Sequence, residues 1–338
     1  MMRKRLGRQT VQLQKPPSVL AWANIGGKME GNGPLAHYFD EINGDSFFGE
    51  KTWEKAESAM QKSVLKRALE RAKLAPGDID YILAGDLLNQ CIGSSFSLRD
   101  FHIPFYGLYG ACSTMGESLA LAAMLIDGGF ADHAAAMTSS HFCTAERQYR
   151  MPVPYGSQRT PTAQWTATAA GCTILSADGP GPYITHITCG RIVDKGITDA
   201  NNMGAAMAPA AYQSLSAFFR ETNTVPSDYD RIFTGDLGEL GHSIVVDFFA
   251  RDGIDITPNY QDCGLLLYDR KGQDMHAGAS GCGCAASVLN GYILRHMRDK
   301  SWERILFAPT GALLSPVSSG QGESIPSICH VICLSAER

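Results

Sequence analysis

One cysteine of this chain stands where proteins often place a nucleophile. Cys112 follows Gly110 and Ala111, and a stretch rich in alanine and other apolar residues begins directly after it. Such a stretch predicts a helix, and a helix N-terminus carries free N–H groups and a partial positive charge that stabilise a thiolate. The alternative is a small residue that fills a tight turn between a strand and a helix. Cys112 is therefore either an activated thiol or a packing residue.

The other cysteines do not indicate a metal site. The chain has ten cysteines, with no C-x-x-C pair and no cysteine–histidine cluster at zinc-binding spacing. Cys282 and Cys284 are close in sequence, which is weak evidence by itself. We expect neither a metal nor another cofactor. Because no apolar segment follows the basic residues near the N-terminus, we expect no secretion signal, a cytoplasmic location and reduced cysteines.

Composition argues against two broad classes of protein. The chain has 338 residues, and 34 acidic and 29 basic side chains give a net charge of −5. A dedicated nucleic-acid-binding protein normally carries a basic stripe, so no nucleic-acid partner is expected. No run approaches the roughly 18 apolar residues that cross a bilayer. The charged fraction of 19% is low, as in a protein with a large core or a subunit interface.

One order of elements occurs twice along the chain. Residues 80–87 (DYILAGDL) and 230–237 (DRIFTGDL) agree at five of eight positions, and each predicts an apolar strand that ends in Gly-Asp. Each copy continues with a glycine-containing turn, an apolar helix and a short strand, at 110–113, 113–127 and 134–138 in the first copy and at 278–281, 284–299 and 305–308 in the second. The repeat predicts a duplicated α/β protein with largely parallel sheets.

The two repeated helices are apolar nearly all round, which favours a position between two layers. Placing both in the middle gives five layers, α-β-α-β-α, and brings both helix N-termini to one shared pocket. We expect an N-terminal half at 1–177 and a C-terminal half at 178–338, divided at the Gly- and Pro-rich turn 178–182. An insertion at about 141–168 breaks the repeat and predicts either a cover over the pocket or a dimerisation arm.

These motifs resemble the thiolases and the ketoacyl-ACP synthases. Residues 110–113, the apolar helix, Gly128-Gly129 and the next strand are similar to their nucleophile segment. Residues 169–175 are similar to the strand that closes their first half, and 278–281 to their second-half glycine motif. The resemblance covers nearly the whole chain and implies a pseudo-duplicated, thiolase-like five-layer fold and a homodimer.

The chain departs from these enzymes at the catalytic partners of the cysteine. The synthases carry a His in a Pro-His motif after the second-half strand, where this chain has Gly235-Asp236. A second partner, His or Asn, falls near Cys282 or Gly283, and the late catalytic Cys of thiolases falls near 308–310, which contains no Cys. An acyl-transfer cysteine needs a base and oxyanion donors. We therefore expect a binding site at a vestigial nucleophile position, and no enzyme.

Longer strings narrow the resemblance to the stage V sporulation protein AD family: AGDLLNQ at 84–90, TSSH at 138–141, AERQ at 145–148, GITD at 196–199, AMAPAA at 206–211 and APTGALLSP at 308–316. The resemblance implies a protein of spore-forming bacteria that binds dipicolinic acid, alone or as its calcium chelate. It also implies uptake of this ligand into the developing spore through the SpoVA channel. The implied partners are the other SpoVA membrane proteins, with peripheral association at the spore inner membrane.

Dipicolinate is a flat pyridine ring with two carboxylates, so it needs cationic or N–H donors at both ends and an apolar slot between them. Helix N-termini supply N–H donors, and Arg147, Arg150 or Arg159 could form a bidentate clamp or ordinary surface ion pairs. Asp86 and Asp236 end the paired strands and could position a donor, contact calcium or cap a turn. The expected ligand-contacting residues are Cys112, Asp86, Asn89, Ser140, His141, Arg147, Arg159, Asp236, Ser280, Cys282 and Thr310.

Two other functions remain open from the sequence. The first is an active acyltransferase of the ketoacyl-ACP synthase or thiolase type, in which Cys112 works with His141 or His276. The second is a scaffold that docks on membrane partners through one face and binds no small molecule.

Overall fold

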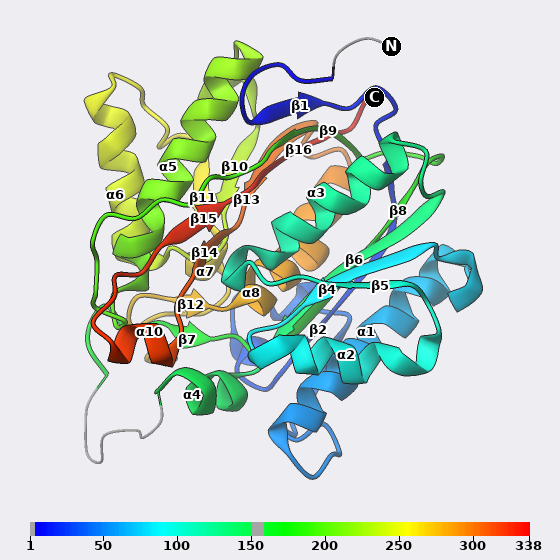
Figure 1. Ribbon diagram of the computed structural model, residues 1–338, viewed down its shortest axis with the longest axis horizontal. Helices are drawn as coiled ribbons and strands as arrows, with labels where there is room; N and C mark the ends of the chain where they lie inside the picture. Colours follow the sequence, from blue (N-terminus) through cyan, green and yellow to red (C-terminus); the bar gives the residue numbers. More distant parts are fainter. Residues whose placement is uncertain (1–3, 151–158) are drawn as a thin grey trace.

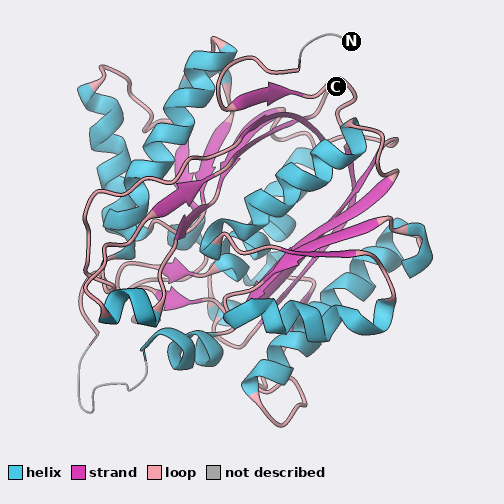
Figure 2. Cartoon of the chain, viewed as in Figure 1, coloured by secondary structure: helices cyan, strands magenta, loops and turns pink. Residues whose placement is uncertain are grey.

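The structure, a computed structural model, describes residues 4–150 and 159–338 and shows a mixed α/β architecture (Figures 1 and 2). Within these residues, twelve strands form one large sheet with the order β11-β10-β13-β16-β9-β2-β8-β6-β4-β5, in which β1 also pairs with β9 and β3 with β2. Its strands are β1 (Thr10–Gln12), β2 (Ser18–Gly26), β3 (Glu41–Ile42), β4 (Tyr81–Gly85), β5 (Phe105–Gly107), β6 (His133–Ser140), β8 (Ala169–Ser176), β9 (Tyr183–Thr188), β10 (Arg231–Thr234), β11 (Tyr260–Asp262), β13 (Arg304–Ala308) and β16 (Val331–Ser335).

The sheet consists of two groups of strands with the same topology. In one group β5, β4 and β6 are parallel, and β8 and then β2 continue in alternating antiparallel pairs. In the other group β11, β10 and β13 are parallel, and β16 and β9 follow in the same way. One antiparallel pair, Ser18 with Tyr183, joins the two groups. The duplication predicted from the two Gly-Asp strands is confirmed.

Equivalent aspartates fix the same strand connection in both groups. The Asp80 carboxylate accepts hydrogen bonds from the backbone N–H groups of Asp132 and His133, at 2.7 and 3.0 Å, where β6 begins. The Asp230 carboxylate accepts the two equivalent bonds at 2.7 and 2.9 Å, where β13 begins. These bonds set the register between neighbouring parallel strands, so the repeated Asp of the sequence has the same structural role twice.

Helices lie outside and between the two groups of strands, which gives the five expected layers (Figure 1). Helices α1 and α2 cover one outer face, α5 and α6 cover the other, and α3 lies in the middle with the run α8–α9. The helices are α1 (Trp53–Ala72), α2 (Ile92–Leu98), α3 (Thr114–Asp127), α4 (Phe142–Arg150), α5 (Met203–Thr222), α6 (Gly238–Arg251), α7 (Cys263–Leu266), α8 (Cys282–Val288), α9 (Leu294–Arg298) and α10 (Pro316–Gly320). No helix in the described ranges is both long and apolar enough to cross a membrane.

The middle layer explains the composition of its helices. Met115, Leu119 and Ala123 of α3 and Ala285 of α8 are fully buried in one core together with residues of both groups of strands. A helix with sheets on both sides cannot expose a polar face, so it must be apolar and narrow all round.

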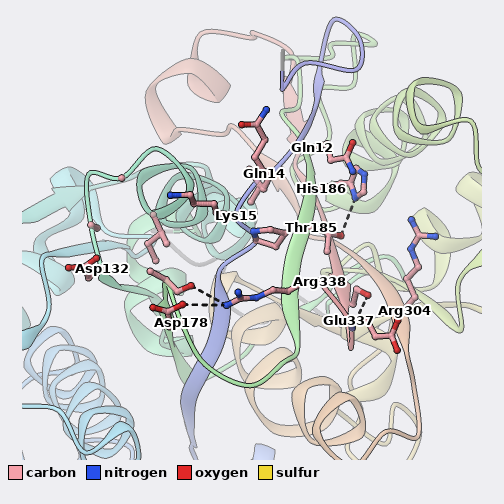
Figure 3. Close-up of a pocket in the computed structure, with 17 residues that line it drawn as sticks. Gln12, Gln14, Lys15, Asp132, Asp178, Thr185, His186, Arg304, Glu337 and Arg338 are labelled. Atoms are coloured by element: carbon pink, nitrogen blue, oxygen red, sulfur yellow. Dashed lines mark hydrogen bonds and ion pairs between the residues drawn. The ribbon is translucent and has the colours of Figure 1, made fainter. Parts of the chain in front are cut away.

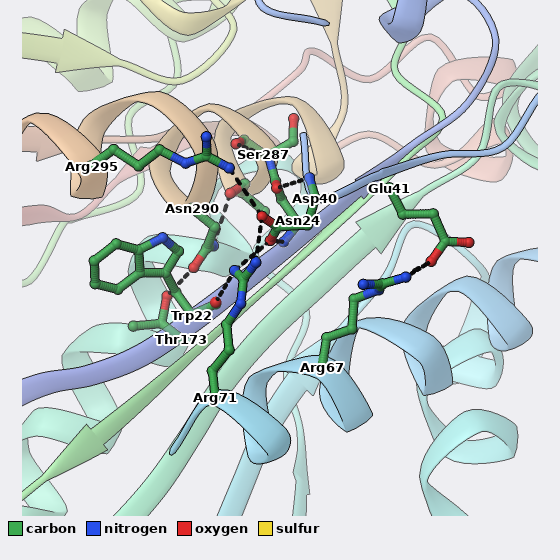
Figure 4. A network of polar contacts seen from close by, with 11 residues as sticks. Trp22, Asn24, Asp40, Glu41, Arg67, Arg71, Thr173, Ser287, Asn290 and Arg295 are labelled. Carbon is green, nitrogen blue, oxygen red and sulfur yellow. Dashed lines mark hydrogen bonds and ion pairs between the residues drawn. The ribbon is translucent and has the colours of Figure 1, made fainter. Parts of the chain in front are cut away.

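The second middle helix differs from the single helix predicted at 284–299. It begins at Cys282 and contains a π-helical segment, Leu289–Ile293, between α8 and α9. At this segment the Asn290 amide donates to the Ala286 carbonyl at 2.9 Å and accepts from the Thr173 hydroxyl at 2.7 Å (Figure 4). A side chain that donates to a backbone carbonyl of the preceding turn competes with the α-helical backbone hydrogen bonds and favours a local π-helical segment.

Two small sheets complete the fold near the middle helices. Strand β7 (Trp165–Thr166) pairs with β12 (Ala279–Ser280), and β14 (Thr310–Ala312) pairs with β15 (Ser327–Cys329). The predicted insertion at 141–168 thus contains α4 and β7, while its residues 151–158 lie outside the described ranges. The division of the chain at residue 177 falls in the loop between β8 and β9 and stays a prediction.

Two carboxyl groups are buried together between α1 and the ends of β4 and β6. Glu57 accepts hydrogen bonds from the hydroxyls of Ser139 and Thr144 at 2.9 and 2.7 Å, and Asp86 accepts from the Ser94 N–H and hydroxyl, both at 2.7 Å. No basic side chain among the described residues pairs with either carboxyl. Burial, and then the charge of Asp86, raise the pKa of Glu57 to about 8. Burial also raises the pKa of Asp86.

Replacing Glu57 with Gln should flatten the pH dependence of stability. Between the ordinary pKa of 4.5 and the folded value of about 8, the folded chain holds a proton that the unfolded chain has lost. The free energy of unfolding of the wild type therefore falls as pH rises through this window. We expect the wild-type Tm to fall between pH 5 and pH 8 by about 2 °C or more relative to Glu57→Gln, measured by circular dichroism melts.

Glu70→Gln is the matched control, because Glu70 is an exposed carboxylate on the same helix. Its pH profile should follow the wild type. Parallel pH profiles for the wild type and Glu57→Gln would contradict a proton held by this buried pair.

Candidate functional site

Cys112 lies in the turn that leads into the first middle helix. A short 3-10 turn, Ala111–Ser113, precedes α3, so the predicted placement of Cys112 at a helix start is confirmed. Ala111 has a φ of 49°, a left-handed conformation that costs free energy for a residue with a side chain. Gly311 of β14 lies so close to this turn that an added Cβ would be 2.1 Å from the Gly110 carbonyl oxygen. The turn is therefore held tightly from the second half of the chain.

A small cavity adjoins the Cys112 side chain. Its volume is ≈ 80 Å³, which is below the roughly 300–1,000 Å³ usual for small-molecule sites. It lies where the start of α3, strand β12, helix α4, the start of α5 and the end of β14 meet (Figure 1). The described residues that line it are Leu87, Ala111, Cys112, Ala145, Glu146, Tyr149, Thr166, Ala200, Asn201, Met203, Ser280, Ala312 and Leu314.

Helix α4 covers this cavity. Ala145, Glu146 and Tyr149 contribute its lining from the segment predicted as a cover or a dimerisation arm. The Tyr149 hydroxyl donates to the Leu87 carbonyl at 2.6 Å and lies 2.7 Å from the Tyr109 hydroxyl. These bonds fasten α4 over Cys112, and the choice between a cover and a dimerisation arm stays a prediction.

Two of the predicted residues stand beside Cys112 in place of the enzymes' partners. Asp236 and Cys282 are close enough to influence the acidity of its thiol. Asp236 Oδ2 accepts from the Gly281 N–H at 2.8 Å, and the Cys282 thiol donates to the Ser139 carbonyl at 2.9 Å. Asp236 Oδ1 makes no well-formed hydrogen bond with a described residue, although the Cys112 thiol is near enough to interact with this carboxyl. The resemblance places a His at the position of Asp236 and an Asn or a His near Cys282.

The electrostatics of the site disfavour a thiolate. Burial, followed by the charge of Asp236, raises the pKa of the Cys112 thiol well above its ordinary value. Burial likewise raises the pKa of Asp236 to about 7. Of the two interpretations of Cys112 that the sequence left open, this direction of the pKa shift favours the packing residue over the activated thiol.

Four predicted ligand contacts, Asp86, Asn89, Ser140 and Thr310, do not line the cavity. Asp86 belongs to the buried network with Glu57, and Asn89 is exposed in a 3-10 turn. The Ser140 hydroxyl donates to the Ala167 carbonyl at 2.7 Å. Thr310 is buried, and its hydroxyl has no hydrogen-bond partner among the described residues.

The candidate histidines also make other contacts. His141 Nδ1 accepts from the Cys143 N–H at 3.1 Å, so its Nε2 carries the proton and donates to the Ser46 carbonyl at 2.8 Å. Burial lowers the pKa of His141, so the ring is neutral. His276 contacts the Thr160 carbonyl and the Asp274 carboxylate. Neither ring lines the cavity, which leaves the acyltransferase hypothesis without its proposed base.

The predicted arginine clamp is not assembled at this cavity. Arg147 pairs with Glu54 at 3.1 Å and lies over the Trp53 ring, and Arg159 pairs with Asp274 at 2.8 Å. The Arg150 side chain lies outside the described part of the structure. The surface ion pairs that the sequence left open as the alternative are thus the observed state of Arg147 and Arg159.

Some lining residues were missed from the sequence. Tyr149 lies in the predicted cover segment, where a tyrosine among polar residues was a usable signal. Asn201 and Met203 precede and begin α5, and Leu314 follows β14. No local pattern marked these three, because they reach Cys112 only through the packing of the two halves.

A larger cavity of ≈ 950 Å³ lies elsewhere, between β1, β9, the end of β16 and the end of α3 (Figure 3). None of the predicted ligand contacts lines it. Its charges largely offset each other, and Arg338 lies 3.8 Å from the Asp178 carboxylate. Its size alone does not make it the better candidate for a dicarboxylate.

Known structures resemble this fold at low sequence identity. 3-Oxoacyl-[acyl-carrier-protein] synthase III from Aquifex aeolicus VF5 matches with a TM-score of 0.60 and 11% identity, over 94% of this chain and 99% of that chain. Xanthomonas campestris OleA with bound cerulenin matches with a TM-score of 0.63 and 13% identity, over 99% and 100%. At this identity the likeness shows the fold alone, and it confirms the thiolase-like fold.

Sequence comparison identifies the family. The family model for stage V sporulation protein AD matches residues 7–335. The stage V sporulation protein AD of Bacillus subtilis (strain 168) is 42% identical over 327 residues, which cover 97% of this chain and 96% of the relative. The chain therefore belongs to the stage V sporulation protein AD family.

Proposed function

We propose that this chain is a non-catalytic, thiolase-fold sporulation protein that binds dipicolinic acid. In this proposal it takes part in uptake of the ligand, alone or as its calcium chelate, into the developing spore with the SpoVA membrane proteins. Membership of the sporulation family supports the role. The single observation that carries the non-catalytic part is the carboxyl of Asp236 beside Cys112.

This observation matters because of what acyl transfer requires. A nucleophilic cysteine needs a base that removes its proton and donors that stabilise the oxyanion. Burial, and then the charge of Asp236, instead raise the pKa of the thiol, and the candidate histidines are engaged elsewhere. A retained, protonated thiol in a covered cavity fits binding better than turnover.

The ligand would enter between Cys112 and α4. Ser280 and Thr166 offer hydroxyl groups there, Asn201 offers an amide, and Leu87 and Met203 offer apolar walls. Because the cavity is small, binding in this proposal requires α4 to move outward. In the cell, peripheral association with the spore inner membrane would bring this binding site to the channel.

We also propose a homodimer through the edge strand β5. This strand ends the sheet path and exposes Phe105 and Tyr106, at 37% and 51%, with Tyr109 close by in sequence at 43%. An exposed apolar edge strand is a template for pairing with another strand. Pairing of two copies of β5 about a twofold axis would extend the sheet and cover these aromatic rings.

Calorimetric titration with dipicolinate tests the binding function. We expect saturable binding by the wild type and a loss of affinity of about tenfold or more in Ala145→Phe, because the added ring fills the cavity from α4. Gln148→Phe is the matched control, since Gln148 is half-buried on the same helix and does not line the cavity. No binding by the wild type would refute the proposal. Equal binding by both variants would move the site elsewhere.

Thiol chemistry tests the non-catalytic assignment. Burial raises the pKa of Cys112 well above its ordinary value and raises that of Cys189 less, and the Cys112 side chain is buried whereas Cys189 is exposed. We therefore expect iodoacetamide at pH 7.5 to modify Cys112 about tenfold or more slowly than Cys189, measured by peptide mass spectrometry. Incubation with acetyl-CoA or malonyl-ACP should leave no acyl adduct on Cys112. A Cys112 adduct that turns over would establish the acyltransferase instead.

Light scattering coupled to gel filtration tests the dimer. Tyr106→Lys should shift the mass from dimer to monomer, since a buried, unpaired ammonium at the twofold axis is costly. Phe130→Lys is the control, because Phe130 is 71% exposed and follows α3, outside strand β5. A monomeric wild type, or equal masses for all three proteins, would contradict the interface.

A further inference from the structure

A further concave site lies along β2, on the side of this strand away from β8. It has a volume of ≈ 320 Å³, within the usual range of roughly 300–1,000 Å³ for small-molecule sites. Strand β2 supplies its floor, α1 supplies Arg71, and α9 supplies Arg295 (Figure 4). We call it the arginine groove, and its described lining residues are Leu20, Ala21, Trp22, Arg71, Arg295 and Arg298. None of these lining residues is acidic.

One buried carboxylate lies beneath the arginine groove, and its hydrogen-bonding capacity is filled. Asp40 accepts from the Asn24 N–H at 2.9 Å, from two Arg71 nitrogens at 2.7 and 2.8 Å, and from Arg295 Nη2 at 3.0 Å. A carboxylate offers about four acceptor sites, whereas each guanidinium carries five N–H donors. Arg71 also donates to the Trp22 carbonyl at 2.8 Å, but Asp40 cannot satisfy the other donors of Arg71 and Arg295, whose side chains stay partly exposed at the groove.

Arg298 adds a third positive charge without an acidic partner. Its guanidinium lies 4.5 Å from the centre of the Trp22 ring and approaches the backbone carbonyls of Val19 and Leu20 at 3.4 and 3.3 Å. No ion pair with Arg298 occurs within the described ranges. Three guanidinium groups and one carboxylate leave an excess of two positive charges at the groove.

The cavity at Cys112 offers the opposite electrostatic environment. Its described lining contains Glu146 but no arginine or lysine. Guanidinium groups bind carboxylates and phosphates with short, charge-assisted and often bidentate hydrogen bonds. Of these two sites, only the arginine groove offers guanidinium donors to a small dianion.

We propose that the arginine groove binds a small dianion, a compact soluble molecule with two or more anionic oxygens such as a phosphate or a dicarboxylate. The anion lies between Arg71, Arg295 and Arg298 and neutralises the two excess charges. Asp40 holds Arg71 and Arg295 in position from below. This site is separate from the Cys112 cavity and does not depend on the function proposed for it.

Calorimetry with two probes tests this inference on the full chain. Inorganic phosphate and dipicolinate are titrated separately into the wild type, Arg298→Gln and Arg67→Gln. Arg298→Gln removes the cation that has no acidic partner, so it leaves Asp40 paired. Arg67→Gln is the matched control, because Arg67 lies one turn before Arg71 on α1 but pairs with Glu41 outside the groove (Figure 4).

We expect at least one probe to bind the wild type and Arg67→Gln alike, and Arg298→Gln about tenfold or more weakly, since a charge-assisted hydrogen bond is lost. Affinity should also fall as salt concentration rises. Thermal melts establish that each variant is folded, and Arg295→Gln provides a second groove variant. The probe with the larger loss identifies the anion as phosphate or dicarboxylate.

Two outcomes would overturn the inference. One is that neither probe binds the wild type, which would mean that the arginines serve to attach α1 and α9 to β2. The other is that both groove variants bind each anion that the wild type binds, and bind it as tightly as the wild type does. For example, both groove variants could retain dipicolinate binding that Ala145→Phe abolishes, with no phosphate binding by any protein. That result would support the Cys112 cavity and reject the groove.

Discussion

The burial of two helices between two groups of strands is the constraint on which the rest of the molecule depends. Helix α8 is buried along its whole length and consists of small residues up to Val288, and α3 is buried apart from a few positions such as Leu121, so both are built mainly from apolar and small residues. Small residues allow the layers to approach, and an added Cβ at Gly283 would be 2.3 Å from the Ala169 carbonyl oxygen. The same burial decides the chemistry at their starts. It keeps Cys112 protonated, although the start of a helix is otherwise a favourable place for a thiolate.

Much of the fold could be predicted because the sequence contains the same order of elements twice. The repeated Gly-Asp strands and the two apolar helices indicated the duplicated topology, and the equivalent bonds of Asp80 and Asp230 show why the aspartate recurs. The π-helical segment at Leu289–Ile293 could not be predicted in this way. It accompanies a contact between Asn290 and Thr173, two residues that are 117 positions apart.

The candidate site was predictable only in part. Cys112, Asp236 and Cys282 were found because they occupy motif positions of a superfamily, and the structure brings them together. The arginines were chosen because the ligand needs cationic donors and because they lie in the segment 141–168. Their partners could not be foreseen, since Arg159 meets Asp274 from 115 positions away. Arg71 and Arg295 do lie together at one carboxylate. They belong to different halves of the chain, and they were not predicted from the sequence as site residues. Long-range charge pairing leaves no local signature, so charged residues were the least predictable part of the site.

The fastening of α4 bears on kinetics as well as on shape. A molecule enclosed beneath α4 leaves only when the hydrogen bond between Tyr149 and Leu87 and the contact between Tyr149 and Tyr109 open. Opening of these contacts then limits the rates of both entry and exit, whereas the equilibrium affinity depends on all the groups that line the cavity, Tyr149 included. A protein built in this way can hold a ligand for long enough to be handed to a partner without binding it tightly, provided that the partner displaces α4.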